Sequence, residues 1–201
     1  MKNLTELDAQ EELRSGLEEL VAAMVEHREA VSVAHGAGTA DWPVLVAVCH
    51  RADVGTVLGK KGDTLDKLRL LATLTARRLG FNGVSLDFDE PSCQGEPHSG
   101  PRPPLVPNPN WDAEWYEKLA TTVVANCLGR CAVALEPGPT RYKLSIALLE
   151  ALPVDEALTR TKDGQSVKPV KAVEAALRKA LGCAGAVAGQ LVSVEVSDES
   201  N

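Results

Sequence analysis

Residues 52–62, Ala52-Asp53-Val54-Gly55-Thr56-Val57-Leu58-Gly59-Lys60-Lys61-Gly62, decide the fold. Val54, Val57 and Leu58 have the spacing of one helical turn, and the glycines that follow interrupt that helix. From Asp63 onward leucines recur every three or four residues, which predicts a second, longer helix. The stretch therefore predicts two helices joined by a glycine-bounded turn, Gly59-Lys60-Lys61-Gly62, which we call the GKKG turn.

Such a turn has the chemistry of a phosphate grip. Backbone N–H groups where one helix ends and the next begins lack intrahelical partners, and the second helix directs its positive dipole end to the same place. Gly59 and Gly62 allow close approach of a phosphodiester, while Lys60 and Lys61 add two positive charges. The bases of a bound strand would lie across an apolar groove lined by residues of both helices and the adjacent strand, namely Val54, Val57, Leu58 and Leu65. For an isolated Gly-x-x-Gly, a plain interhelical turn with exposed lysines is the better interpretation, so the surrounding elements decide.

The elements around the GKKG turn predict a complete α+β unit. An apolar stripe from Leu13 to Val25 predicts a leading helix, and short strands are expected from Val31 and over residues 44–49. Alternating apolar residues over 84–88 predict a closing strand. The predicted order is α-β-β-α-α-β.

This pattern resembles the type II KH domain, in which Gly-x-[Ile/Val/Leu]-[Ile/Val/Leu]-Gly-x-x-Gly separates two helices. Residues 12–90 are more narrowly similar to the small bacterial single-domain RNA-binding proteins of the KhpA type, including the helix end at Val25-Glu26-His27 and the Ala52-Asp53-Val54-Gly55 entry. The resemblance implies a three-stranded sheet with helices on one face. It also implies that the clamp and groove recognise about four nucleotides of single-stranded RNA. The implied role is that of an RNA chaperone or post-transcriptional regulator.

We expect different roles for the basic residues beyond the GKKG turn. Lys67 and Arg69 begin one and two turns after it and are candidate RNA contacts. Arg77 and Arg78 end the long helix, where cations suit the negative dipole end. We expect these two arginines to cap the helix.

The second half predicts a degenerate repeat of the first. We divide the chain into a KH domain at 1–90, a Pro-rich linker at 91–110 and a KH-like domain at 111–201. The position that matches the GKKG turn is Thr161-Lys162-Asp163-Gly164, which lacks the first glycine and carries Asp163 in place of a lysine. We expect this copy not to clamp RNA by itself and to support folding, self-association or a protein partner. The basic excess over 159–180 could make an auxiliary backbone contact or be a solvated helix face.

Charge is unevenly distributed along the chain. The formal net charge is −7, but residues 50–80 hold seven basic and three acidic side chains. One basic strip on an acidic protein can hold a phosphate backbone locally, with weak grip on long polyanions. The acidic balance also fits an alternative class, a protein-interaction or ribosome-associated scaffold that retains the KH fold without strong RNA binding.

Other function classes find little support. No apolar run is long enough to span a bilayer, the first residues lack a signal pattern, and five scattered cysteines do not predict a disulfide framework, so we expect a cytoplasmic location. Cys127 and Cys131 could share a metal but are expected to be apolar packing residues. The histidines look separated and without carboxylate partners. We therefore predict neither an enzyme nor a cofactor or metal site. Three tryptophans could stack on bases but are expected to pack: Trp42, Trp111 and Trp115.

Overall fold

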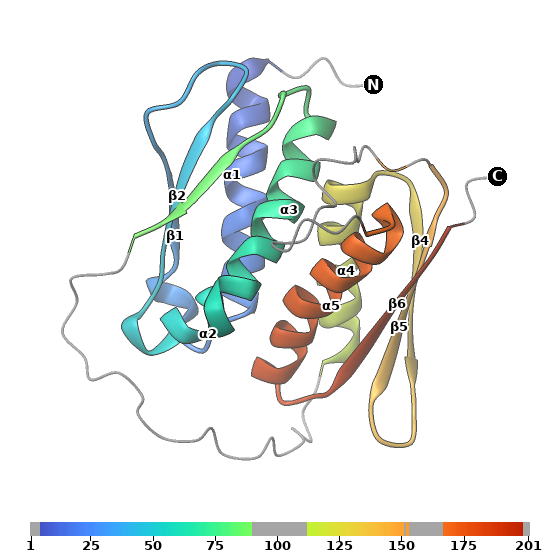
Figure 1. The fold of residues 1–201 in the computed structure, drawn as a ribbon. Coiled ribbons are helices and arrows are strands. Elements are labelled where there is room, and N and C mark those ends of the chain that lie inside the picture. The colour runs from blue at the N-terminus through green and yellow to red at the C-terminus, as the bar shows by residue number, and fades with distance from the viewer. Residues whose placement is uncertain (1–4, 90–111, 151, 153–166, 199–201) are drawn as a thin grey trace.

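The computed structural model describes residues 5–89, 112–150, 152 and 167–198. Within these residues five α-helices and two three-stranded sheets form a mixed fold, which confirms the α+β part of the predicted fold class. Figure 1 shows the layers: the helices of both halves lie in the middle, with one sheet on each side. None of the helices in the described part is both long and apolar enough to cross a membrane.

The first half has the predicted order α-β-β-α-α-β. Strand β1 pairs antiparallel with β2, and β2 pairs parallel with β3, so β2 is central. Short 3₁₀ turns lie between these elements at Arg28–Ala30, Arg51–Asp53 and Lys60–Gly62. The elements are α1 (Glu6–Ala23), β1 (Ser32–His35), β2 (Val44–Val48), α2 (Val54–Leu58), α3 (Asp63–Arg78) and β3 (Ser85–Phe88).

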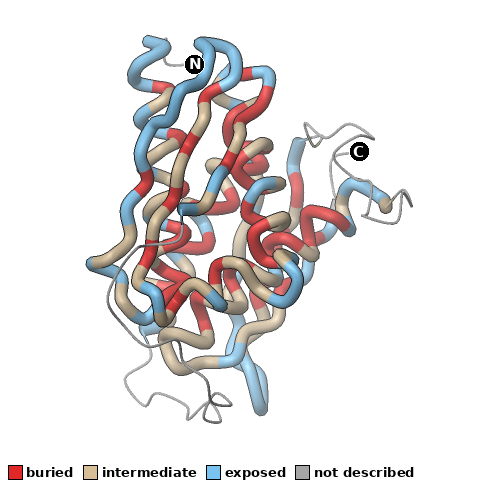
Figure 2. The backbone as a smooth tube through the Cα atoms, turned by 60° about the vertical axis from the view of Figure 1, so that its left-hand side comes forward, coloured by how far each residue is buried: buried red, intermediate tan, exposed pale blue. Residues whose placement is uncertain are grey.

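Local signals explain where the helices begin and which face they bury. Thr5 and Asp8 form a capping box that starts α1, each side chain accepting a hydrogen bond from the other residue's backbone N–H at 3.2 Å. The predicted leucine stripe of α3 faces the core, with Leu68, Leu71 and Leu74 at most 1% exposed. In Figure 2 the buried positions run along the helices and recur along the strands.

The second half forms a sheet with the same pairing pattern as the first. Strand β4 pairs antiparallel with β5, and β5 pairs parallel with β6. Its described elements are α4 (Ala113–Leu128), β4 (Cys131–Pro137), β5 (Tyr142–Leu148), α5 (Pro169–Val187) and β6 (Val192–Asp198). The predicted linker at 91–110 and the clamp-like position 161–164 lie outside the described residues.

The two halves are packed against each other through their helices. Helix α3 contacts both α4 and α5, and buried residues of both halves form one apolar cluster. Arg78 Nη1 donates hydrogen bonds to Ala125 O and, at 3.0 Å, to Asn126 O at the end of α4. The guanidinium of Arg28 lies 5.0 Å from the centroid of the Trp115 ring. The KH-like first half therefore shares its core with the second half.

Candidate functional site

The GKKG turn has an unusual backbone. Gly59 (φ 70°), Lys61 (φ 57°) and Gly62 (φ 80°) all have positive φ, and Lys61 is the one non-glycine residue with this conformation in the described part of the chain. Gly59 ends α2 by donating from its N–H to Gly55 O at 3.0 Å, and Gly62 is the N-cap of α3. The turn thus connects the two helices within four residues.

Gly59 also lies in tight contact with the start of α3. A Cβ added at Gly59 would lie 2.1 Å from Thr64 Oγ1 and 2.8 Å from the Thr64 backbone nitrogen. No side chain fits there without movement of the backbone, so both the φ angle and the available space require glycine. From the sequence, Gly59 was expected to allow close approach of a phosphodiester. In the structure, the atoms that lie closest to Gly59 belong to Thr64 in α3.

The electrostatics of the turn combine favourable and unfavourable groups for an anion. Lys60 and Lys61 are exposed, and because Gly62 has no side chain to cap α3, the amino end of that helix is not closed by its N-cap residue. The carboxylates of Asp63 and Asp66 lie in the first turn of α3. They stabilise the helix dipole but oppose an anionic ligand.

Arg69, a candidate RNA contact, is held against β3. Its Nε donates to Leu86 O at 3.0 Å, and its Nη1 lies 3.5 Å from Asp66 Oδ1. This side chain therefore joins α3 to the edge of the sheet. Lys67, the other candidate, is half-buried.

The apolar residues near the turn divide between surface and core. Val54 and Leu58 are partly buried and pack against the core, so each retains surface that a ligand can contact. Val57 and Leu65 are 1% and 8% exposed. This corrects the expectation that Val57 and Leu65 line an open groove, because both side chains lie beneath that surface and support it.

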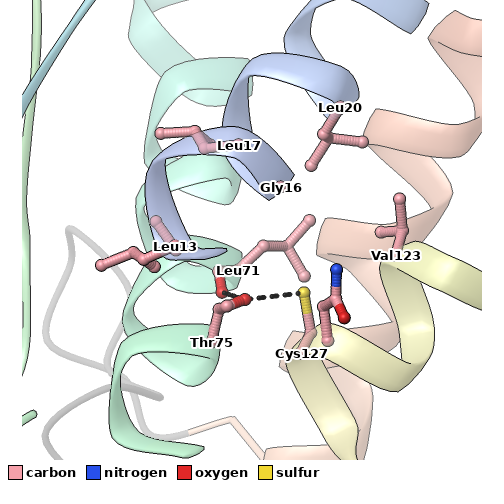
Figure 3. Close-up of a pocket in the computed structure, with 10 residues that line it drawn as sticks. Leu13, Gly16, Leu17, Leu20, Leu71, Thr75, Val123 and Cys127 are labelled. Carbon is pink, nitrogen blue, oxygen red and sulfur yellow. Dashed lines mark hydrogen bonds between the residues drawn. The ribbon is translucent and has the colours of Figure 1, made fainter. Parts of the chain in front are cut away.

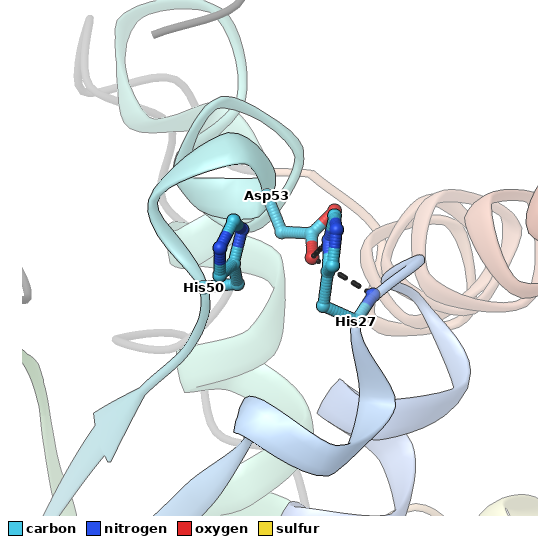
Figure 4. A group of neighbouring side chains, drawn as sticks. All are labelled: His27, His50 and Asp53. Carbon is cyan, nitrogen blue, oxygen red and sulfur yellow. Dashed lines mark hydrogen bonds and ion pairs between the residues drawn. The ribbon is translucent and has the colours of Figure 1, made fainter. Parts of the chain in front are cut away.

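A cluster of His27, His50 and Asp53 was missed from the sequence (Figure 4). Asp53, 4% exposed, accepts hydrogen bonds from the backbone N–H groups of Glu26 at 3.2 Å and His27 at 3.1 Å. Its Oδ2 also lies 2.9 Å from His27 Nδ1, and the two imidazole rings stack with centroids 4.0 Å apart. The expectation that the histidines lack a carboxylate partner was wrong, because the fold joins the segment after α1 to the entry of α2.

These three side chains could hold a metal ion, since one ligand atom from each lies within 4.8 Å of the others. Their hydrogen bonds favour a structural role, in which Asp53 links the segment after α1 to the entry of α2. The Asp53 carboxylate already accepts from two backbone groups, and His50 Nδ1 accepts from Ala52 N at 3.3 Å. A bound ion would have to displace part of this network.

Replacing Asp53 with Ala is expected to destabilise the fold. The substitution leaves two backbone N–H groups without their acceptor, and an unsatisfied buried donor costs about 1–3 kcal/mol. Urea unfolding of the full chain, followed by circular dichroism, measures the loss. Asp89→Ala, which removes an exposed carboxylate beyond β3, is the control and should change stability by less than about 0.5 kcal/mol. Equal stability of the two variants would show that the hydrogen bonds of Asp53 contribute nothing to the free energy of unfolding.

Arg78 and Trp115 take part in the packing of the two halves against each other. Arg78 caps α4 rather than its own helix, which corrects the expected capping of α3. Trp115 is partly buried under Arg28, whereas Trp42 is 48% exposed and its ring lies over Gly83. Trp111 lies outside the described residues.

An apolar pocket between α1, α3 and α4 contains Cys127 (Figure 3). Thr75 Oγ1 donates to Leu71 O at 3.0 Å, so the thiol 3.3 Å away donates to Thr75 in turn. Burial raises the pKa of Cys127 to about 11, so the thiol stays protonated at neutral pH. This fits a packing role and not a reactive or metal-binding thiolate.

The GKKG turn between two helices, beside a sheet with one antiparallel and one parallel pair, defines the class: a KH domain, which is a nucleic-acid-binding and non-enzymatic kind of domain. Residues 14–88 match the family model described as KhpA/KhpB, KH domain. This segment is therefore a KH domain resembling KhpA-type proteins, and the family suggests RNA binding. No curated protein and no solved structure shows significant similarity to the chain.

Proposed function

We propose that the first half grips single-stranded RNA through the GKKG turn. The observation that supports this most directly is the backbone of the turn, where positive φ at Gly59, Lys61 and Gly62 presents two exposed lysines at the amino end of α3. Phosphates would bind there, through backbone N–H groups and lysine charges. The KH family match supports the same class of ligand.

The neighbouring residues would complete the site. Bases would lie against Val54 and Leu58, with Val57 supporting them from the core. Lys67, one helical turn after the clamp, would approach the sugar–phosphate backbone of the RNA. Arg69 would act chiefly as a positioning residue, because its bond to Leu86 O sets the distance between α3 and β3.

We further propose that the second half is a degenerate KH-like copy, which makes the architecture a tandem one. Its strand pairing repeats that of the first half, and Arg178 donates to Val194 O of β6 as Arg69 does to Leu86 O of β3. Glu117 accepts from Leu135 N of β4 as Glu18 does from Val33 N of β1. In this proposal the second half, by packing on α3, supports the first and offers a surface for self-association or a protein partner.

The biological role that follows is RNA chaperoning or post-transcriptional regulation in the bacterial cytoplasm. A grip on the backbone reads little sequence, because phosphate contacts are the same for every nucleotide. Low sequence specificity suits a protein that acts on many RNAs.

The test is a fluorescence-anisotropy titration of a labelled eight-nucleotide RNA with the full chain at several salt concentrations. Neutralising three or four phosphates predicts that log K falls with log salt at a slope of roughly −2 to −3. A double-stranded RNA of the same length should bind more weakly, because its bases cannot spread across the groove. Absence of binding at low salt would reject the RNA proposal and favour the protein-interaction scaffold, whose apolar contacts respond little to salt.

A further inference from the structure

The GKKG turn lies beside a helix of the second half. Figure 1 shows α3 and α5 side by side and antiparallel, and the two helices are in contact. Lys179 Nζ of α5 lies 3.7 Å from Oδ2 of Asp63, the residue that directly follows Gly62. A cation from the second half is therefore placed at the edge of the turn in the first half.

The charge balance of the turn explains how the Lys179 ammonium group can affect anion binding. From Lys60 to Asp66 two lysines are balanced by two aspartates, so the segment has no net charge of its own. Asp66 is paired with Arg69 on the same helix, whereas Asp63 is paired with Lys179. Without Lys179, the Asp63 carboxylate would repel an anion bound at the amino end of α3.

We infer that Lys179 is a third cation of the phosphate grip, so that both halves of the chain build one RNA-binding surface. This inference rests on the proposed function of the GKKG turn. A separation of 3.7 Å is long for an ion pair, and the side chain is 39% exposed on a flexible four-carbon stem. The ammonium group can therefore contact a backbone phosphate while remaining near Asp63. The ligand it recognises is the RNA phosphate, independent of base identity.

The other basic residues of α5 are engaged elsewhere. Lys171 Nζ lies 2.7 Å from Glu174 Oε2, and Arg178 pairs with the same carboxylate, which is 6% exposed. Arg178 also donates to Val194 O at 3.3 Å. Lys171 and Arg178 thus serve the second half itself, and Lys179 is the residue that reaches the first.

Lys179→Ala in the full chain tests the inference in the anisotropy titration with the eight-nucleotide RNA. Loss of one phosphate contact predicts an affinity lower by roughly three- to tenfold at low salt and a salt slope smaller by about 0.7. Lys171→Ala removes the same charge from the same helix, about 12 Å away along the axis, and should change affinity less than twofold. Lys179→Arg keeps the charge and should restore binding. Circular dichroism checks that all variants remain folded.

Two outcomes would overturn the inference. If Lys179→Ala binds as Lys171→Ala does while Lys60→Asp with Lys61→Asp abolishes binding, the clamp stands and Lys179 is not part of it. The Asp63→Asn background separates direct contact from screening. Lys179→Ala must still lower affinity there, and an unchanged affinity would reduce Lys179 to a neutraliser of Asp63. If the wild type does not bind RNA or the lysine double variant binds normally, the proposed function itself fails.

Discussion

Replacing Lys60 and Lys61 together with Asp is expected to abolish RNA binding while leaving the fold intact. Both side chains are exposed, and reversing both charges replaces two attractions of about 1 kcal/mol each by two repulsions of similar size. The sum of about 4 kcal/mol corresponds to roughly a thousandfold loss of affinity. The backbone tolerates the change at position 61, because Asp adopts the left-handed conformation that Lys61 has (φ 57°) more readily than most residues do.

The control for this variant must carry the same change in net charge. Lys118→Asp with Arg130→Asp reverses two exposed basic residues of the second half, outside the proposed site. Anisotropy titration at low salt should show near wild-type affinity for this control and no measurable binding for the clamp variant. Equal weakening of the two would mean that the chain attracts RNA by overall charge alone, without a defined grip at the turn.

Much of the first half could be predicted from local patterns. The strand over 84–88 follows from strict alternation, and the long helix follows from leucines three and four residues apart. The two glycines of the turn mark the break between α2 and α3, because each adopts a backbone that other residues avoid. These signals act over a few residues, so the sequence displays them directly.

Contacts between distant residues could not be predicted in this way. Asp53 accepts from the backbone 26 and 27 residues earlier, and Arg78 donates to the carbonyl of Asn126, 48 residues later and near the end of α4. Neither hydrogen bond is marked by a regular spacing in the sequence, because each depends on how folded helices and strands pack against one another. Val25-Glu26-His27 and Ala52-Asp53-Val54-Gly55 are separate features of the family resemblance, and only the structure shows that the Asp53 carboxylate links the two segments.

The same limit applies to the composite nature of the candidate site. Lys179 looked like one member of a basic helix face, and its neighbours Lys171 and Arg178 have equal charge. The packing of α5 on α3 distinguishes them, by bringing Lys179 to Asp63. Charge counts along the chain therefore indicated a basic segment without indicating which residue faces the turn.

Gly59→Ala is expected to be strongly destabilising. The residue has φ 70° and ψ 178°, a conformation open almost only to glycine, and holding alanine there costs about 1–3 kcal/mol. The new methyl group would also overlap Thr64 Oγ1 and the Thr64 backbone nitrogen, and such overpacking costs about another 1–3 kcal/mol. Urea unfolding of the full chain should therefore show a loss of roughly 3–5 kcal/mol, which is a large share of the stability of a typical domain.

Gly55→Ala is the matched control, because the same methyl group is added four residues earlier in α2. Nothing lies within 4 Å of a Cβ at Gly55, and its φ is not positive, so the variant should be stabilised by about 0.5–1 kcal/mol. Opposite signs for the two variants would assign Gly59 to the architecture of the turn. They would leave Gly55 with no structural need for glycine, so a loss of RNA affinity in Gly55→Ala would then report close approach of the RNA to α2. Similar stability for both variants would contradict the tight contact between Gly59 and Thr64 on which the shape of the clamp depends.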